Sequence, residues 1–358
     1  MKEIYVNIHD LIKFKVTDGS SWLSQAITGD LLEEYCNYLS SDSINESDLD
    51  FIISITSRLE KKQDCHVLDD EYYLNNGYFF TKDSYKIAKW KIELLRLHNQ
   101  YFITLHPNLI ARLFITGFFI DFLIQFSLTR KGYSIIHSSG LTKNNSSYLF
   151  SGRSGSGKTS LSLGLMSCDS SYKFLGDDFQ ILVNGKSFPY ITPLNLFSYN
   201  ISDYLLARLN RDEKIKMRFK SAIYKLTGGY AKFFTKLNPA TSFHNMIGSC
   251  SDISKLFIIH PTNDCLSNGI KINKIQKQAA VKYITYNQMM DSRYFPKYLI
   301  QYGFMFPNDE LSRYWELHMQ NLNNNLTNNV EFYLINLPSR LIRSKLALNK
   351  IKGIIENA

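Results

Sequence analysis

A glycine-rich segment at residues 150–160 has the composition and spacing of a phosphate-binding loop. It reads Phe-Ser-Gly-Arg-Ser-Gly-Ser-Gly-Lys-Thr-Ser, so Gly152 is followed, after four residues, by Gly157-Lys158-Thr159. An apolar stretch at 148–150 precedes the loop, and a helix-compatible run at 161–166 follows it. A strand, such a loop and a helix are the context that the motif requires, and they favour nucleotide binding over a surface turn of the same composition.

The residue types in the loop define its chemistry. Glycines let the backbone turn tightly, so that its N–H groups point at phosphate oxygens and the positive end of the following helix adds to them. We predict that Lys158 reaches the β- and γ-phosphates and that Thr159 places its hydroxyl on Mg²⁺. The predicted ligand is ATP or another nucleoside triphosphate with Mg²⁺. The predicted binding residues are Gly152, Arg153, Ser154, Gly155, Ser156, Gly157, Lys158, Thr159 and Ser160.

A second polar motif, Gly176-Asp177-Asp178, interrupts a strand-like stretch at 172–183. Asp177 lies eighteen positions beyond Thr159, which is enough for a helix of roughly nine residues, a turn and an extended return. The interval predicts a strand adjacent to the one that feeds the loop. Because side chains alternate along an extended segment, the two carboxylates should have different partners, Mg²⁺ or its water for one and the incoming nucleophile for the other. An ordinary surface turn is the alternative.

The sequence on the N-terminal side of these motifs predicts a small α+β module over residues 1–107. Its expected elements are a strand-like segment at 4–15, a helix at 22–39, a loop at 41–48, a hairpin with a type I′ turn at Asn76-Gly77, and strands at 89–97 and 101–105.

The remaining sequence, 108–358, predicts an α/β phosphate-loop domain, because sheet and helix patterns surround a single loop. A long helix is expected at 108–128, a strand at 133–137, and a polar turn at 138–147 before the loop strand. Beyond the aspartates we expect an extended segment at 188–197, a basic helical region at 201–226, strands at 255–260 and 330–336, and helices at 276–290 and 341–356.

Composition and charge narrow the class of protein. Of 358 residues, 44% are hydrophobic and 20% charged, which is ordinary globular usage. Nine Lys and Arg residues against three Asp and Glu residues place +6 of the net charge of +9 between 201 and 239. This segment is a solvated helix face, a contact for an acidic or phosphorylated substrate, or a nucleic-acid surface.

Cysteine usage and hydropathy point to a cytoplasmic protein that is not inserted in a membrane. The five cysteines form no CxxC pair, as expected for a reducing compartment. The N-terminus has no apolar signal core. The most apolar run, 109–128, contains Arg112, Asp121 and Gln125, so we expect a buried helix there.

His137, the 152–159 loop and Gly176-Asp177-Asp178 stand in an order and at spacings that resemble the HPr kinase/phosphorylase family. The chain is more similar still to the HPr-kinase-related proteins often found beside peptide-modifying genes. The resemblance covers about residues 130–200. It implies a PEP-carboxykinase-like phosphate-loop fold and phosphoryl transfer from a nucleotide to a serine hydroxyl.

The same resemblance implies roles for individual residues. Lys158 would bind phosphate and Thr159 would bind Mg²⁺. The aspartate pair would supply the general base and a metal contact. Asp178 is assigned as the base and Asp177 as the metal contact, and Asp177 is also the alternative base. His137 would support the base, and a structural histidine at a strand end is the alternative.

Two departures limit this transfer. Thr159-Ser160 stands where the bifunctional members have Ser-Glu, and the chain has no counterpart of their later Gly/Arg-rich signature with its metal-binding glutamate. Neither phosphorylase activity nor HPr as the substrate is therefore predicted.

We therefore expect a Mg²⁺-ATP-dependent kinase that acts on a hydroxyl of a peptide, protein or small molecule. The basic segment would guide an acidic acceptor, and Arg208, Arg211 or Arg218 would contact the transferring group. A nucleotide-hydrolysing switch and a nucleic-acid-binding ATPase are the alternatives; the sequence has neither an Asn-Lys-x-Asp guanine signature nor a Leu-Ser-Gly-Gly transporter signature. The oligomeric state, a homo-oligomer included, is left open.

Overall fold

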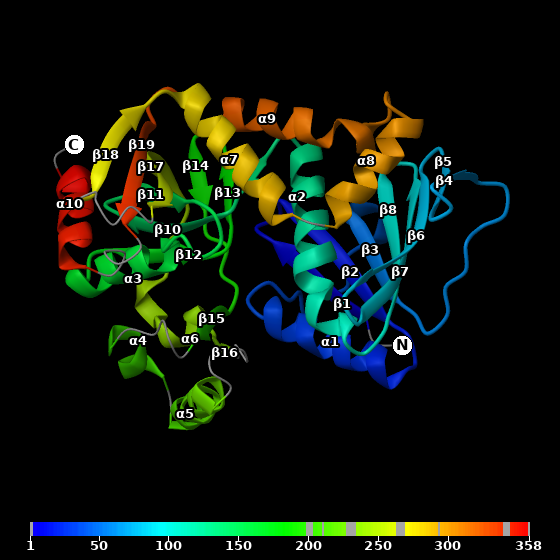
Figure 1. The fold of residues 1–358 in the computed structure, drawn as a ribbon, viewed down its shortest axis with the longest axis horizontal. Helices are drawn as coiled ribbons and strands as arrows, with labels where there is room; N and C mark the ends of the chain where they lie inside the picture. Colours follow the sequence, from blue (N-terminus) through cyan, green and yellow to red (C-terminus); the bar gives the residue numbers. More distant parts are fainter. Residues whose placement is uncertain are drawn as a thin grey trace. The chain divides into compact units, whose positions relative to one another are not determined.

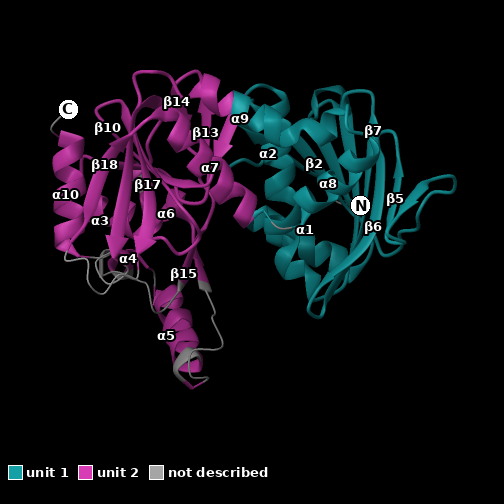
Figure 2. Ribbon diagram, turned by 45° about the horizontal axis from the view of Figure 1, so that its top comes forward, with its two compact units in different colours: residues 1–132, 292–320 teal, residues 133–291, 321–358 magenta. Residues whose placement is uncertain are grey.

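The chain forms two compact units (Figure 2). Unit 1 comprises residues 1–132 and 292–320, and unit 2 comprises 133–291 and 321–358. The computed structural model describes residues 3–197, 203–209, 211–226, 234–262, 269–292, 294–338 and 344–356. Both units combine sheets with helices, so the expected mixed α/β fold is confirmed. Within these described residues, no helix is both long and apolar enough to cross a membrane.

Unit 1 is built on an eight-stranded sheet (Figure 1). Its strands, in spatial order, are β1 (Glu3–Ile8), β2 (Ile12–Asp18), β3 (Phe51–Ile55), β8 (Gln100–Pro107), β7 (Ala88–Leu97), β6 (Tyr78–Tyr85), β5 (Tyr72–Asn75) and β4 (His66–Leu68). The unit also contains α1 (Trp22–Glu34), the short helices η1 (Glu46–Asp48), η2 (Ala111–Phe114), η3 (Thr116–Ile120) and η5 (Glu310–Arg313), α2 (Asp121–Arg130), α8 (Phe295–Met305) and the start of α9 (Tyr314–Asn325).

Local predictions in unit 1 were largely confirmed, with instructive differences. The segment 4–15 contains a hairpin, because His9 and Asp10 adopt positive φ and turn the chain between β1 and β2. The hairpin at 76–77 is confirmed by pairing of Asn75 with Tyr78. Only Gly77 of the central pair has positive φ, 71°, so the expected type I′ turn is wrong.

The units do not separate at residue 108, where the sequence predicted a boundary. The helical segment expected at 108–128 runs from η2 to α2, and residues 122–129 of α2 are buried. Phe126 of α2 packs edge-to-face on Tyr101 of β8, with 5.2 Å between ring centroids. The apolar helix therefore completes the core of unit 1, and the chain enters unit 2 only at Tyr133.

Unit 2 is built on a nine-stranded sheet. Its main path is β12 (Lys173–Gly176), β10 (Ser138–Lys143), β11 (Ser146–Ser151), β17 (Ser251–Thr262), β14 (Lys186–Phe188), β13 (Gln180–Val183) and β9 (Ser134–Ile136). β19 (Glu331–Pro338) also pairs with β17, and β18 (Lys271–Ile275) pairs with β19. β11, β17 and β19 are mutually parallel.

Helices cover both faces of this sheet. α3 (Lys158–Cys168) and α10 (Lys345–Glu356) share one core cluster with Phe150, whereas α7 (Lys277–Asp291) and the end of α9 share the other with Leu149. Figure 1 shows α3 and α10 as neighbours at one side of the sheet. Consecutive residues of β11 thus enter opposite cores, as the period of a strand requires. The strands expected at 255–260 and 330–336 and the helix expected at 276–290 are confirmed, and the described part of the terminal helix begins at Lys345.

Two predictions about the strands around the loop were wrong. Most of the expected polar turn at 138–147 is the β10–β11 hairpin, whose turn is limited to Asn144 and Asn145, both with positive φ. β12 is not adjacent to β11, because β10 lies between them and pairs antiparallel with both. β11 and β12 therefore run in the same direction, and their carboxyl ends reach the same edge of the sheet.

A two-stranded ribbon carries the basic segment. β15 (Leu194–Phe197) pairs with β16 (Phe234–Leu237), and the chain between them contains α4 (Asp203–Arg208) and α5 (Arg211–Leu226). The short helices α6 (Pro239–Ser242) and η4 (His244–Met246) follow β16. Among the described residues, the expected helical region at 201–226 is therefore two helices.

Candidate functional site

Three chain segments meet at one edge of the unit 2 sheet. The loop follows the end of β11, the aspartate pair follows the end of β12, and His137 precedes the start of β10. The register fixes their proximity, since Ser138 pairs with Ser151 and Gly140 pairs with Gly176. The topology therefore brings together the motifs that the sequence singled out.

The loop backbone has the conformation that its glycines permit. Gly155 and Gly157 have φ values of 79° and 97°, which side chains rarely allow. At Gly152, an added Cβ would lie only 2.7 Å from both the carbonyl oxygen of Ile259 and Oγ of Ser156. Gly157 directly precedes α3, so the loop leads into a helix N-terminus, which is a favourable position for phosphate.

Lys158 is folded over the loop. Its Nζ donates to the carbonyl oxygens of Gly152 at 2.8 Å and of Arg153 at 3.3 Å, and the side chain is buried. Burial lowers the pKa of Lys158, while the negative charges of Asp177, Asp178 and Asp291 oppose that change. The ammonium group thus lies in a field of three carboxylates.

Asp177 is the most perturbed carboxylate of the site. Burial and the adjacent charge of Asp178 raise the pKa of Asp177 to about 7, against hydrogen bonds from Thr159 and Ser139 and the charge of Lys158. Its Oδ1 is shielded from solvent and has no hydrogen-bond partner among the described residues. A carboxylate oxygen in this situation is incomplete without a cation or a proton.

His137 pairs with a carboxylate that the sequence analysis did not single out. Its Nδ1 lies 2.6 Å from Oδ2 of Asp291, the last residue of α7. Burial raises the pKa of Asp291, but the hydrogen bond to His137, the charges of His137 and Lys158 and the backbone N–H of Ser154 together hold it below its usual value. His137 Nδ1 therefore contacts Asp291, and support of the base by His137 stays a prediction.

Ser139 is a second residue that sequence analysis missed. Its Oγ lies 2.6 Å from Oγ of Ser162 in α3 and donates to the carbonyl oxygen of Gly176 at 3.2 Å. It links β10, α3 and the start of the aspartate motif. Its position in an apparently polar turn concealed it, and only the pairing of β10 with β12 places it beside Asp177.

The other predicted residues fall into two groups. Arg153, Ser154 and Gly155 form the exposed tip of the loop, Ser156 is buried, and Gly157, Thr159 and Ser160 are half-buried. The three arginines of the basic segment lie on α4 and α5, the helices between β15 and β16. Arg208 is half-buried with its Nη2 3.6 Å from Sδ of Met246, whereas Arg211 and Arg218 are exposed on α5.

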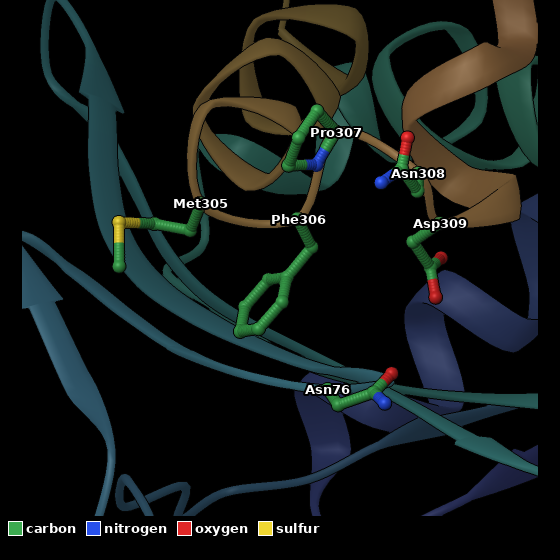
Figure 3. Close-up of a pocket in the computed structure, with 6 residues that line it drawn as sticks. All are labelled: Asn76, Met305, Phe306, Pro307, Asn308 and Asp309. Carbon is green, nitrogen blue, oxygen red and sulfur yellow. The ribbon is translucent and has the colours of Figure 1, made fainter.

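Unit 1 contains a pocket of a different character (Figure 3). Its volume is about 390 Å³, and it is lined by Asn76 and by residues 305–309, with Asp309 in its wall. Both carboxylate oxygens of Asp309 accept from Arg96, at 3.1 and 2.7 Å. The charge in this pocket is therefore already neutralised within the protein.

No protein-family model matches the sequence, and no curated protein matches it. Among solved structures, the Hpr(Ser) kinase/phosphatase from Coxiella burnetii is similar to this chain, with a TM-score of 0.27 and 9% sequence identity, over 63% of this chain and 99% of that chain. A similarity of this extent defines neither a fold nor an activity.

Proposed function

We propose that this protein is a Mg²⁺-ATP-dependent kinase that transfers a phosphoryl group to a hydroxyl, that of a serine in a peptide or protein or that of a small molecule. One observation carries the proposal. The Asp177 carboxylate, which interacts with the Thr159 hydroxyl, a second carboxylate and the loop lysine, has a buried Oδ1 without a hydrogen-bond partner among the described residues. This is the set of groups that phosphoryl transfer requires, a phosphate cradle, a metal ligand and a carboxylate base.

The residues present fit a Mg²⁺-nucleotide. Oxygen ligands suit Mg²⁺, and it is commonly held by one or two carboxylates together with substrate phosphates. Thr159 and Asp177 would supply the protein's oxygens, while the loop N–H groups and Lys158 would hold the phosphates. Bound Mg²⁺ would neutralise negative charge on the phosphates.

Asp178 is the residue to which we assign the proton transfer. A new bond forms between the acceptor oxygen and the γ-phosphorus, and the bond from that phosphorus to the β–γ bridging oxygen breaks. ADP leaves with the bond's electron pair, and the hydroxyl proton passes to the Asp178 carboxylate. Asp178 is half-buried, and its position next to Asp177, whose pKa is raised, supports a division of labour between the two.

His137 and Asp291 are assigned to positioning. Their hydrogen bond connects the residue between β9 and β10 to the end of α7, and Asp291 also interacts with the backbone of Ser154 at the loop tip. Such a pair would hold the loop tip in one conformation for the nucleotide. The PEP-carboxykinase-like fold of unit 2 is part of the same proposal, supported by the sequence of hairpin, loop, helix and aspartate motif on one sheet edge.

The decisive experiment is a measurement of ATP turnover with and without an acceptor. A kinase releases ADP in proportion to the phosphate gained by added serine-containing peptides or small-molecule alcohols, detected by mass spectrometry. ADP release at the same rate without any acceptor, and with no phosphorylated product, would instead identify a hydrolytic switch.

A further inference from the structure

α5 presents a line of apolar residues on its exposed side. Ile215, Phe219, Ala222 and Leu226 are separated by four, three and four positions, so they lie along one side of the helix. The three large ones are 55%, 67% and 86% exposed. These four residues are called the α5 stripe below. Scattered exposed apolar residues are ordinary, but a contiguous set of them marks an interaction surface.

The opposite side of α5 attaches the helix to unit 2. Met217 is 5% exposed and belongs to the core cluster that also contains Leu205 and Leu209. At 3.6 residues per turn, Met217 lies roughly 160–200° around the helix from Ile215 and Phe219. The α5 stripe is therefore turned away from the core that holds the helix.

Basic side chains border the α5 stripe on both sides. Arg211, Lys214 and Arg218 lie along one border and Lys216 along the other, as the helical rotation of about 100° per residue requires. The acidic residues of α5, Asp212 and Glu213, are confined to its first turn. A complementary surface would have apolar residues in a line with carboxylates on either side.

The segment that carries α5 is attached to the strand that presents the aspartates. On its way to β15, Tyr190 pairs with Gly176 and donates its N–H to the carbonyl oxygen of Leu175 at 2.7 Å. On its return, Gly248 donates its N–H to the carbonyl oxygen of Phe174 at 2.8 Å. Figure 2 shows α5 standing clear of the sheet of its own unit, beyond β15.

We propose that the α5 stripe binds the phosphoryl acceptor, and that this acceptor is an acidic peptide segment with apolar residues at helical spacing. The inference rests on the proposed kinase function. Because both ends of the α5 segment attach to β12, a peptide held by α5 remains tethered to the edge where Asp177 and Asp178 lie. Tethering raises the effective concentration of its serine at the site.

Fluorescence anisotropy tests the docking separately from the chemistry. The probes are a fluorescein-labelled amphipathic peptide with Leu along one side, Glu on its borders and one terminal Ser, and the same peptide with Lys in place of Glu. We expect the wild-type protein to bind the Glu peptide at least about tenfold more tightly, with a difference that shrinks as salt is added.

Two α5 variants identify the surface. Ile215→Ser with Phe219→Ser removes apolar contacts, and Lys214→Glu with Lys216→Glu reverses charge on both borders. Each should weaken binding of the Glu peptide about tenfold, and the charge variant should now favour the Lys peptide. Phe304→Ser is the matched control, because Phe304 is 75% exposed on α8 of unit 1. Nucleotide binding and thermal unfolding show whether each variant is folded. If the apolar variant does not fold, the charge variant alone tests the proposal.

Each outcome is informative. Equal affinity of wild type and both variants for the Glu peptide would overturn the proposal, as would binding of phosphatidylserine vesicles through the α5 stripe with no preference between peptides. If the Glu peptide binds through α5, but ADP is released at the same rate with and without every added acceptor and no phosphorylated product forms, the docking surface stands and the kinase function fails. If the peptide is phosphorylated equally by wild type and variants, the kinase function stands and the docking surface fails.

Discussion

The partly buried charges of unit 1 and those of the candidate site in unit 2 are partnered in different ways. In unit 1, arginine side chains meet carboxylates directly, as Arg96 does with Asp309 at 2.7 Å and Arg112 with Asp30 at 2.5 Å. In unit 2, Lys158 is buried and donates to two loop carbonyl oxygens, while Asp177 keeps an oxygen without a partner among the described residues. A paired charge is compensated within the protein, whereas an incompletely paired buried charge costs stability and suits a ligand.

A second contrast concerns two titratable groups, His318 and Asp177, each with a solvent-shielded atom that has no hydrogen-bond partner among the described residues. His318 in unit 1 has no hydrogen-bond partner for either ring nitrogen among the described residues, and its neighbours include the rings of Tyr314 and Trp315, each with its centroid 5.8 Å away. Asp177 lies instead among hydroxyls and beside a lysine. An apolar cage keeps the histidine neutral, whereas the polar surroundings of Asp177 can accommodate a cation. Lack of a partner alone therefore does not define a site.

Replacement of Lys158 by Ala should have the largest effect on activity. The loss of its positive charge should reduce kcat/KM for phosphoryl transfer by a factor on the order of 10⁴ while the protein remains folded, because the lysine neutralises charge on the phosphates. Steady-state kinetics measures the effect, and Lys186→Ala, at an exposed position of the same unit, is the control. Normal turnover in a folded Lys158→Ala protein would contradict the assignment of the loop.

The aspartate pair should divide into two roles. Asp178→Asn should lower the single-turnover rate by about 10² to 10⁴ with nucleotide affinity largely kept, because it removes the proposed base. Asp177→Asn should instead raise the Mg²⁺ concentration that half-saturates turnover, because it removes a metal ligand. Magnesium titration and single-turnover kinetics distinguish the two. If both variants behaved like the wild type, the Gly176-Asp177-Asp178 motif would be an ordinary turn without a catalytic role.

Acid should destabilise the protein through His318. Burial lowers the pKa of His318 from 6.5 to about 4. Above pH 6.5 the imidazole is neutral in the folded and unfolded states. Between pH 6.5 and 4 only the unfolded state takes up the proton, so this group should lower the free energy of unfolding by about 3 kcal/mol across that interval. Urea unfolding at a series of pH values measures the slope.

Asp177 contributes to pH dependence with the opposite sign. Because its folded pKa is raised, its contribution to stability is present below the unfolded pKa of 3.8 and is lost as pH rises toward 7. His318→Phe should remove the acid-side loss, and Asp177→Asn should remove the loss near neutrality. His66→Phe, at an exposed position, is the control for the histidine variant. If the free energy of unfolding varied with pH in the same way for wild type and His318→Phe, the predicted contribution of His318 would be refuted.

Asp291→Asn should give the smallest of these effects. The substitution preserves shape but removes the charge opposite His137 and near the loop tip. We expect KM for ATP to rise by a few-fold, with kcat changed less, since the residue positions the loop and does not contact the reacting atoms. A pH profile of kcat/KM that moves with this substitution would distinguish positioning through His137 from a purely structural role.

Local sequence was sufficient for several parts of the site. Gly152, Gly155 and Gly157 predict a tight loop because other residues do not tolerate its backbone, and the apolar residues on either side predict a strand and α3. Gly176, the last residue of β12, adopts φ 144°, where the sequence predicted an interruption between two strands. These features depend on steric preferences and hydrophobic periods within a few residues of the chain, which can be read without knowledge of the fold.

Only the tertiary structure decided which segments meet. Ser139 and Gly140 have the composition of a turn, but they are buried because β10 inserts between β11 and β12. Asp291 reaches His137 across 154 positions of sequence, through the packing of α7 on the sheet. Strand order and helix packing depend on which distant apolar surfaces bury one another, and residue types within one segment do not specify that choice. The sequence therefore determined the chemical groups of the site, and the fold determined their partners.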